Sequence, residues 1–193
     1  MKIFQEKLPY KNINSLVLSE IDIDCSKDLD HFINVLKYII MGKVIFLELM
    51  NADTFFCPDH LLEFYQDYLP KLIQQNGKYI VTHKKNDSRF QSIANIEINN
   101  KTLLFIEHIW RYYLGVLFFV PGSAFSLEEF QFKKENFKPD IYGMGYIKNN
   151  ITDMTFTKGH DGDNLIITFN SNIYDTEEIL HRICKIVELE PPY

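Results

Sequence analysis

The sequence has few cysteines and no arrangement of them that predicts a disulfide or a zinc site. Its 193 residues include three, Cys25, Cys57 and Cys184, which is an odd number without paired spacing. Small secreted domains that cannot build a sizeable core carry many paired cysteines. The scarcity here predicts a cytoplasmic protein, and we interpret all three thiols as structural.

No stretch of the sequence predicts a membrane span or a secretory signal. The most apolar segment, residues 103–120, contains Glu107, His108 and Arg111. Charged side chains are expensive at the centre of a bilayer, so this segment is interpreted as core. Residues 1–7 have charges on either side of a very short apolar patch, whereas a signal peptide has a longer apolar region. We therefore expect no membrane association.

Basic residues are in the minority. The chain has 20 Lys and Arg against 26 Asp and Glu, a formal net charge of −6 and a pI near 5.5. Affinity for nucleic acid comes largely from Lys and Arg that neutralise phosphates. The charge balance therefore argues against nucleic acid as the main partner.

The sequence also lacks the common catalytic and cofactor motifs. It has no H-E-x-x-H, Walker loop, Cys-x-x-Cys or G-x-S-x-G pattern, and residues 143–145 are only a fragment of a dinucleotide-binding motif. His160, Asp161 and Asp163 lie within one short segment, as in a metal or acid/base site, but Asp and Gly are also common in hairpin turns. We prefer the turn and predict no catalytic residue, metal or cofactor.

Apolar residues, by contrast, are abundant. Hydrophobic residues make up 46% of the chain and aromatic residues 15%. A chain of this length buries roughly 70% of the surface that it exposes when unfolded. No internal repeat, low-complexity tract or flexible linker divides it, so residues 1–193 are predicted to form a single globular domain.

Hydrophobic periodicity alternates between strand and helix patterns along the chain. The predicted strands are residues 16–23, 44–49, 79–83, 93–98, 116–120, 154–157 and 165–169. Helices are predicted at residues 26–40 and 103–113, with a short helical segment from residue 126 and a final helix from residue 175. A further helix is predicted to begin at Pro58 and Asp59, and Pro70 is expected to kink it or end it early. The pattern predicts an α+β fold, a mostly antiparallel sheet with about three to four packed helices on one face or both.

Helix starts and turns have their own signals. Ser126 and Glu129 match a capping box, and Asp175 with Glu178 predicts the cap of the final helix. Ser26 is predicted to cap the first helix. Asp161-Gly162 is a favoured turn pair between the last two strands.

Acidic residues form a stripe on the second predicted helix. Residues 44–70 contain no Lys or Arg, and Asp59, Glu63 and Asp67 recur at spacing i, i+4, i+8. Like charges at this spacing repel by a few tenths of a kcal/mol per pair unless an external basic partner relieves them. We predict that these three residues bind a partner, with a solvated face as the alternative.

A second acidic cluster follows the first predicted strand. Glu20, Asp22 and Asp24 alternate with Ile21 and Ile23, which predicts three carboxylates on one strand face. This cluster has the same two interpretations, and we include it among the predicted partner-binding residues.

The chain length, the Asp161-Gly162 hairpin, the strand at 165–169 and the terminal helix from Asp175 together resemble the immunity proteins that neutralise bacterial polymorphic or contact-dependent toxins. The resemblance implies a bacterial inhibitor of a cognate toxin domain, many of which are basic nucleases. It carries over no family site residue. An acidic surface would attract such a basic partner, and aromatic anchors would supply affinity.

Two alternatives remain open from the sequence. The chain is a structural or regulatory domain that forms homodimers through aromatic residues around Trp110, Tyr112 and Tyr113, or it is a small hydrolase that uses His160, Asp161 and Asp163. The protein is thus expected to be a monomer or a homodimer, with a protein partner in the preferred interpretation.

Overall fold

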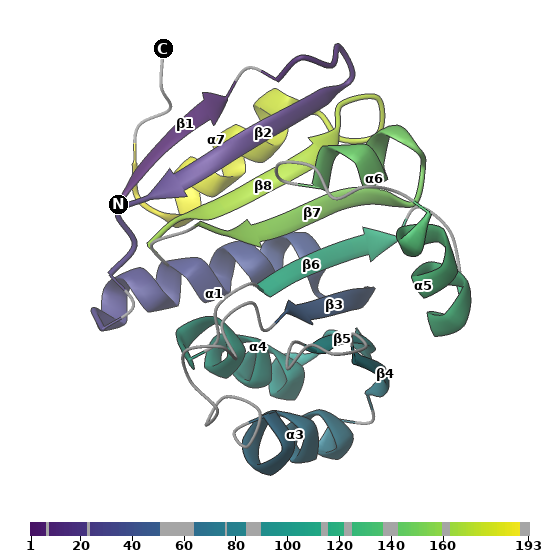
Figure 1. Ribbon diagram of the computed structural model, residues 1–193. Coiled ribbons are helices and arrows are strands. Elements are labelled where there is room, and N and C mark those ends of the chain that lie inside the picture. The colour runs from purple at the N-terminus through teal and green to yellow at the C-terminus, as the bar shows by residue number, and fades with distance from the viewer. Residues whose placement is uncertain are drawn as a thin grey trace.

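In the part of the chain that the structure describes, eight strands form one antiparallel sheet (Figure 1). The computed structural model describes residues 1–6, 8–22, 24–50, 64–75, 77–83, 90–112, 116–121, 125–136, 143–159 and 163–189. The strands are β1 (Lys2–Glu6), β2 (Ile13–Ser19), β3 (Val44–Met50), β4 (Lys78–His83), β5 (Phe90–Glu97), β6 (Val116–Pro121), β7 (Thr152–Lys158) and β8 (Leu165–Asn170). Their order across the sheet is β1-β2-β8-β7-β6-β3-β5-β4, and each neighbouring pair is antiparallel.

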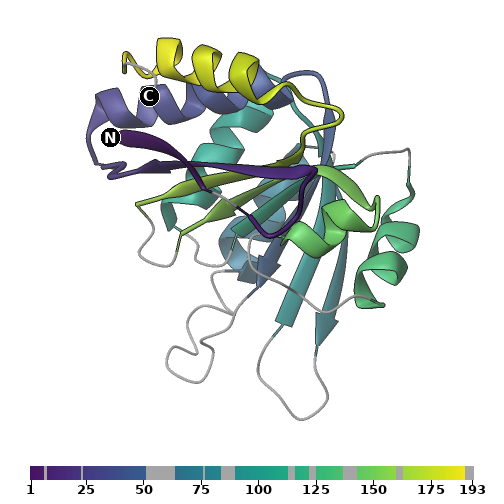
Figure 2. The same ribbon diagram turned by 90° about the horizontal axis from the view of Figure 1, so that it is seen from above.

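Helices lie on both faces of this sheet (Figure 2). They are α1 (Ser26–Ile40), the π-helical turn η1 (Phe64–Tyr68), α3 (Leu69–Gln74), α4 (Asn100–Tyr112), α5 (Leu127–Glu135), α6 (Met144–Lys148) and α7 (Thr176–Ile186). The first face carries α1, α3, α4 and α7, and the opposite face carries α5 and α6. The predicted α+β class is confirmed. Within the described ranges, no helix combines the length and the apolar character needed to span a membrane.

The larger core lies between the sheet and the first helical layer. Successive strand residues point to opposite faces, so alternate apolar positions of the strands meet the helices. Examples are Leu16, Leu47, Phe156 and Ile167 from the sheet, with Phe32, Leu36, Ile106, Trp110 and Ile183 from the helices. Trp110 is completely buried and its ring centre lies 4.6 Å from that of Phe32. The predicted homodimer surface around Trp110 is therefore wrong for this residue, because its side chain is inside the core.

The opposite face has a smaller core under α5 and α6. Phe130 of α5 stacks on Phe46 of β3, with ring centres 4.1 Å apart and planes 5° from parallel. Both side chains are buried, and Ile93, Leu127, Tyr146 and Ile151 complete the cluster. Residues next to each other along β3 thus serve different cores, since Ile45 and Leu47 face the first layer.

The predicted helix caps are confirmed at two of three sites. In the capping box, the Ser126 amide donates to Glu129 Oε2 at 2.7 Å and the Glu129 amide donates to Ser126 Oγ at 3.1 Å. The Glu178 amide donates to Asp175 Oδ1 at 3.0 Å, as expected for the cap of α7. The prediction for Ser26 is wrong, because Cys25 is the N-cap of α1 and makes no side-chain cap.

The segment around Pro70 differs from a continuous helix. Pro70 lies in the first turn of α3, directly after η1, and is exposed. Proline has no backbone N–H, so a regular helix cannot run through this point without losing a hydrogen bond. Tyr68 and Leu72 are buried, whereas Ile73 is 53% exposed. The predicted start of this helix at Pro58 lies outside the described residues.

Lys158 is a buried cation that completes the end of α4. Its ammonium donates to the carbonyl oxygen of Trp110 and lies 5.8 Å from the centre of that ring. Carbonyl groups in the last turn of a helix lack helical partners and attract cations. Burial lowers the pKa of Lys158, but its geometry is that of a helix cap.

Candidate functional site

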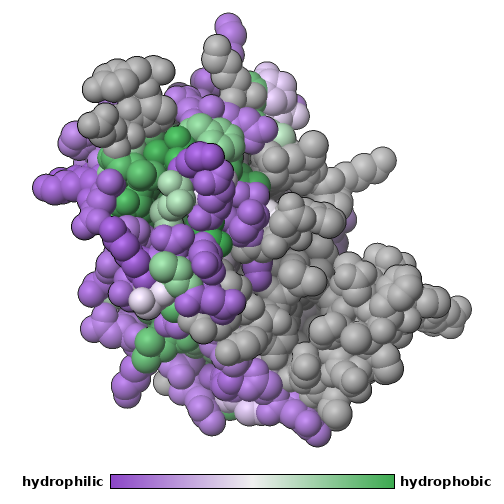
Figure 3. All heavy atoms as spheres, turned by 90° about the vertical axis from the view of Figure 1, so that its left-hand side faces the viewer, coloured by the Kyte–Doolittle hydropathy of each residue, from purple (hydrophilic) through white to green (hydrophobic). Residues whose placement is uncertain are grey.

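The connection between β2 and α1 carries carboxylates at one end of the sheet. Glu20, Asp22 and Asp24 are exposed, and Asp28 follows in the first turn of α1. Figure 3 views the molecule from this end, and hydrophilic residues make up most of the described surface that it shows. The position at the start of α1 is favourable, because the N-terminal end of a helix attracts negative charge.

The predicted strand face for these residues is wrong. β2 ends at Ser19, and Glu20 adopts a left-handed backbone with φ of 59°. A residue in this conformation cannot continue a regular strand ladder. The three carboxylates therefore share a loop, where their directions are set by local hydrogen bonds.

The tertiary structure adds Asp163 to this group. The Ile21 amide donates to the Asp163 carbonyl at 2.9 Å, which brings the β7–β8 connection beside the β2–α1 loop. Asp163 Oδ1 is buried and has no hydrogen-bond partner among the described residues. We name Glu20, Asp22, Asp24, Asp28 and Asp163 the acidic surface. Sequence reasoning had placed Asp163 only in the alternative hydrolase site, since nothing local indicates its neighbours on β2.

Backbone amides hold the loop of the acidic surface. The Asp24 amide donates to Asp22 Oδ1 and the Asp22 amide donates to Asp28 Oδ2, each at 3.0 Å. Such turns are typical of aspartate, whose short side chain reaches nearby backbone N–H groups. Asp22, Asp24 and Asp28 form no ion pair with any described residue. Their negative charge therefore remains available to a partner.

Two lysines on this side of the molecule are already paired. Lys2 forms an ion pair with Glu20, and this hydrogen bond lowers the pKa of the Glu20 carboxyl. Lys27 Nζ lies 2.7 Å from Glu188 Oε2, at the end of α7. Exposed pairs of this kind contribute little stability, and neither lysine contacts Asp22 or Asp24.

Asp67 does not belong to a free acidic stripe. Its Oδ1 pairs with Lys71 one turn later, and its Oδ2 lies 2.6 Å from Nε2 of His108 on α4. Burial opposes ionisation of Asp67, but the hydrogen bonds from Lys71 and His108 outweigh it and lower the pKa of the carboxyl. Asp67 is therefore attracted to two groups of the protein itself, Lys71 and His108. Asp59 and Glu63 lie outside the described residues.

His108 Nε2 has one neighbour that only donates and one that only accepts. It lies 2.8 Å from Lys71 Nζ and 2.6 Å from Asp67 Oδ2. A ring nitrogen with a proton donates to the carboxylate, whereas one without a proton accepts from the ammonium. The protonation of His108 thus decides which of the two contacts is a hydrogen bond.

We expect Asp67 and His108 to be energetically coupled. In a double-mutant cycle of Asp67→Asn and His108→Gln, the coupling energy is expected to be about 0.2–1 kcal/mol at pH 6, the range of partly exposed ion pairs. Because the pKa of Asp67 is lowered in the folded state, this stabilisation is present above the unfolded pKa of about 3.9 and is lost as the pH falls through the folded value. Urea unfolding at pH 6, and again at a pH well below the unfolded pKa, measures the loss of this stabilisation.

The exposed Lys27–Glu188 pair is the control for this cycle. Its side chains are 64% and 65% exposed, against 26% and 38% for His108 and Asp67. Its coupling is expected to be smaller, because water screens the charges more completely. Equal coupling energies in the two pairs would contradict the predicted interaction between Asp67 and His108. A coupling energy of zero for Asp67 and His108 at pH 6 would also contradict it.

Of the three residues of the hydrolase alternative, only Asp163 is among the described ones. Within those residues, no group of three or more His, Cys, Asp or Glu is placed to hold a metal ion. Cys184 is buried, and burial raises the pKa of its thiol, as expected for a structural cysteine. Cys25 is exposed at the start of α1. Cys57, Tyr113, His160 and Asp161 lie outside the described residues.

Comparison of the chain with protein-family models, with curated proteins and with solved structures finds no match. The function is therefore argued from the geometry and charge of the chain itself.

Proposed function

We propose that this protein is a proteinaceous inhibitor of the immunity type, which binds and neutralises a basic toxin domain through its acidic surface. The observation that carries the proposal is the β2–α1 loop, in which the carboxylates of Asp22 and Asp28 accept backbone amides and Asp24 is exposed, with no basic side chain paired to any of the three among the described residues. Lys27 is already paired with Glu188, which is the main cause of its raised pKa, and Asp28 adds to that rise. A basic partner would compensate the charge of the three aspartates.

The two hydrogen bonds that fix Asp22 and Asp28 within the loop support a binding role. A surface that already has its bound shape loses less conformational entropy on association. Unpaired charges of one sign increase the rate at which an oppositely charged partner arrives. The acidic surface combines both properties.

An exposed aromatic side chain lies on the neighbouring edge strand. Phe4 on β1 is 45% exposed, two residues from Lys2, which pairs with Glu20. Protein interfaces obtain much of their affinity from aromatic anchors, while surrounding charges set the association rate. We therefore assign Phe4 the anchoring role beside the acidic surface.

The test is a triple variant in which Asp22, Asp24 and Asp28 are each changed to Asn. Asparagine keeps the oxygen atoms that accept the loop hydrogen bonds and removes only the charge. Capture from a lysate of the source cell with the wild-type protein identifies the partner, and association kinetics are then measured at two salt concentrations. We expect the triple variant to bind with an on-rate lower by on the order of tenfold at low salt, and by less at high salt.

The control is Glu177→Gln, the same kind of charge change at an exposed site on α7. α7 begins near the start of β2, since Ile13 pairs with Asn170 at the end of β8, whereas the acidic surface lies where β2 ends. Glu177→Gln is expected to leave the on-rate unchanged. A triple variant that associates as fast as wild type would remove the acidic surface from the interface.

A further inference from the structure

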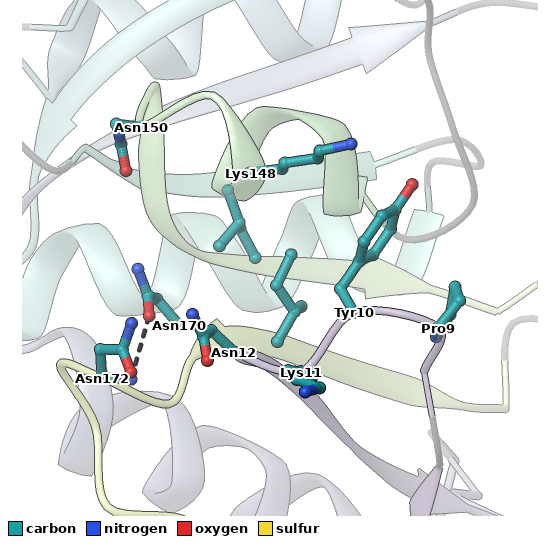
Figure 4. Close-up of a pocket in the computed structure, with 10 residues that line it drawn as sticks. Pro9, Tyr10, Lys11, Asn12, Lys148, Asn150, Asn170 and Asn172 are labelled. Carbon is teal, nitrogen blue, oxygen red and sulfur yellow. Dashed lines mark hydrogen bonds between the residues drawn. The ribbon is translucent and has the colours of Figure 1, made fainter.

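A separate cavity lies at the opposite end of β2 from the acidic surface (Figure 4). Its volume is about 380 Å³, which is within the range of small-molecule sites. Three parts of the chain meet there: the β1–β2 connection with the start of β2, the end of α6, and the end of β8 with the turn that follows. The lining residues are Pro9, Tyr10, Lys11, Asn12, Ile13, Ile147, Lys148, Asn150, Asn170 and Asn172.

Hydrogen bonds between these segments form the walls of the cavity. The Ser171 amide donates to the Asn12 carbonyl at 2.9 Å, which joins the turn after β8 to the start of β2. The Asn172 amide donates to Asn170 Oδ1 at 3.0 Å. Asn150 closes α6 with a left-handed backbone, φ of 54°. The cavity is therefore preformed by the fold.

The floor of the cavity is apolar. Ile13 and Ile147 are 4% and 1% exposed and belong to a small cluster with Met144. Figure 4 shows their neighbours: the amides of Asn12, Asn170 and Asn172 gather on one side, and Tyr10 and Lys148 lie on the other. Such a site offers hydrogen bonds around an apolar base, as ligand sites in proteins do.

The polar groups around the cavity are largely uncommitted. Asn12, Asn150 and Asn172 are exposed, and their side-chain amides make no hydrogen bond with another described residue. The Asn170 oxygen is used within the wall, which leaves its amide nitrogen free to donate. Lys148 Nζ lies 4.9 Å from the centre of the Tyr10 ring, which holds this cation at the edge of the cavity.

The charge of the lining is opposite to that of the protein. Two lysines and no carboxylate line the cavity, in a chain with a net charge of −6. Local positive charge in a recess attracts anions, and lysine is a common ligand of phosphate groups. Asparagine amides both donate and accept, which suits the hydroxyl groups of a sugar.

We propose that this cavity binds a small sugar phosphate, whose phosphate is attracted by the lysines at the rim, Lys11 and Lys148, and whose sugar hydroxyls meet the asparagine amides. The volume accommodates a monosaccharide phosphate, and the open amides have no other assigned function. This site does not depend on the partner-binding role of the acidic surface, because the two lie at opposite ends of β2.

The experiment is isothermal titration of the full chain with ribose 5-phosphate, ribose and inorganic phosphate. We expect ribose 5-phosphate to bind at least tenfold more tightly than ribose. Lys148→Gln and Lys11→Gln are each expected to weaken the binding of ribose 5-phosphate by about tenfold, because each variant loses one charged contact. The control is Lys37→Gln, which changes an exposed lysine on α1, on the other face of the sheet. It should bind like wild type.

Several results would overturn the proposal. Absence of heat with all three probes excludes the site, and equal affinity for ribose and ribose 5-phosphate excludes recognition of the anion. Inorganic phosphate that binds as tightly as ribose 5-phosphate excludes recognition of the sugar. A melting curve for each variant verifies that it is folded, and Asn12→Ala is a further variant expected to weaken binding without changing the charge.

Discussion

Replacing Phe130 by alanine is expected to destabilise the protein by about 3–5 kcal/mol, the range for deletion of a large buried aromatic side chain. Phe130 is completely buried and stacks on Phe46, so alanine would leave a cavity under α5 and expose the ring of Phe46. Urea unfolding followed by circular dichroism measures the change. The result tests whether the second face of the sheet is a true core.

Phe132 supplies the matched control on the same helix. It lies two residues from Phe130 and is 70% exposed, so Phe132→Ala removes the same atoms from a site that water already reaches. We expect this change to stay within about 0.5 kcal/mol of wild type. Similar losses for the two variants would show that α5 does not bury Phe130 in solution.

Replacing Ile183 by alanine is expected to cost about 2–5 kcal/mol. Ile183 is on α7, is completely buried, and belongs to the larger core with residues of α1 and the sheet. The loss follows from removing three carbon atoms from a closely packed interior, where neighbours relax only partly. Denaturant unfolding with a two-state fit measures it.

Ile173 is the corresponding control, because it is 54% exposed just before α7. Ile173→Ala is expected to change stability by no more than about 0.5 kcal/mol. A second test removes α7 entirely by ending the chain at Tyr174. If the shortened chain unfolded at the denaturant midpoint of the full chain, α7 would be an appendage and not part of the core.

Local structure was predictable where neighbouring residues determine it. The caps at Ser126 and Asp175, and the helix followed by a strand between residues 100 and 121, depend on side chains within a few positions of one another. Hydrophobic periodicity did not predict the end of a strand that is set by the backbone conformation of one residue. The left-handed Glu20 ends β2 although the alternation of apolar residues continues, because periodicity does not report φ.

Strand order was not predictable from the same patterns. β3 lies between β5 and β6, and β2 pairs with β8 across most of the chain length. A strand in which apolar and polar residues alternate has one apolar face whichever strand it pairs with. Its sequence pattern therefore does not indicate which strand lies next to it in the sheet. The contact between Phe130 and Phe46 was not predictable for the same reason, because the two rings meet only after the sheet has formed.

The sequence by itself determined that this protein is acidic, rich in apolar residues and of the α+β class, since these follow from composition and local periodicity. Only the tertiary structure decided which carboxylates remain free. Asp67 pairs with His108, 41 residues away, whereas the carboxylates of Asp22 and Asp28 accept backbone amides and pair with no cation among the described residues. The sequence shows which residues carry a charge. The electrostatic energy between two charges depends on the distance between them in space, and only folding sets that distance.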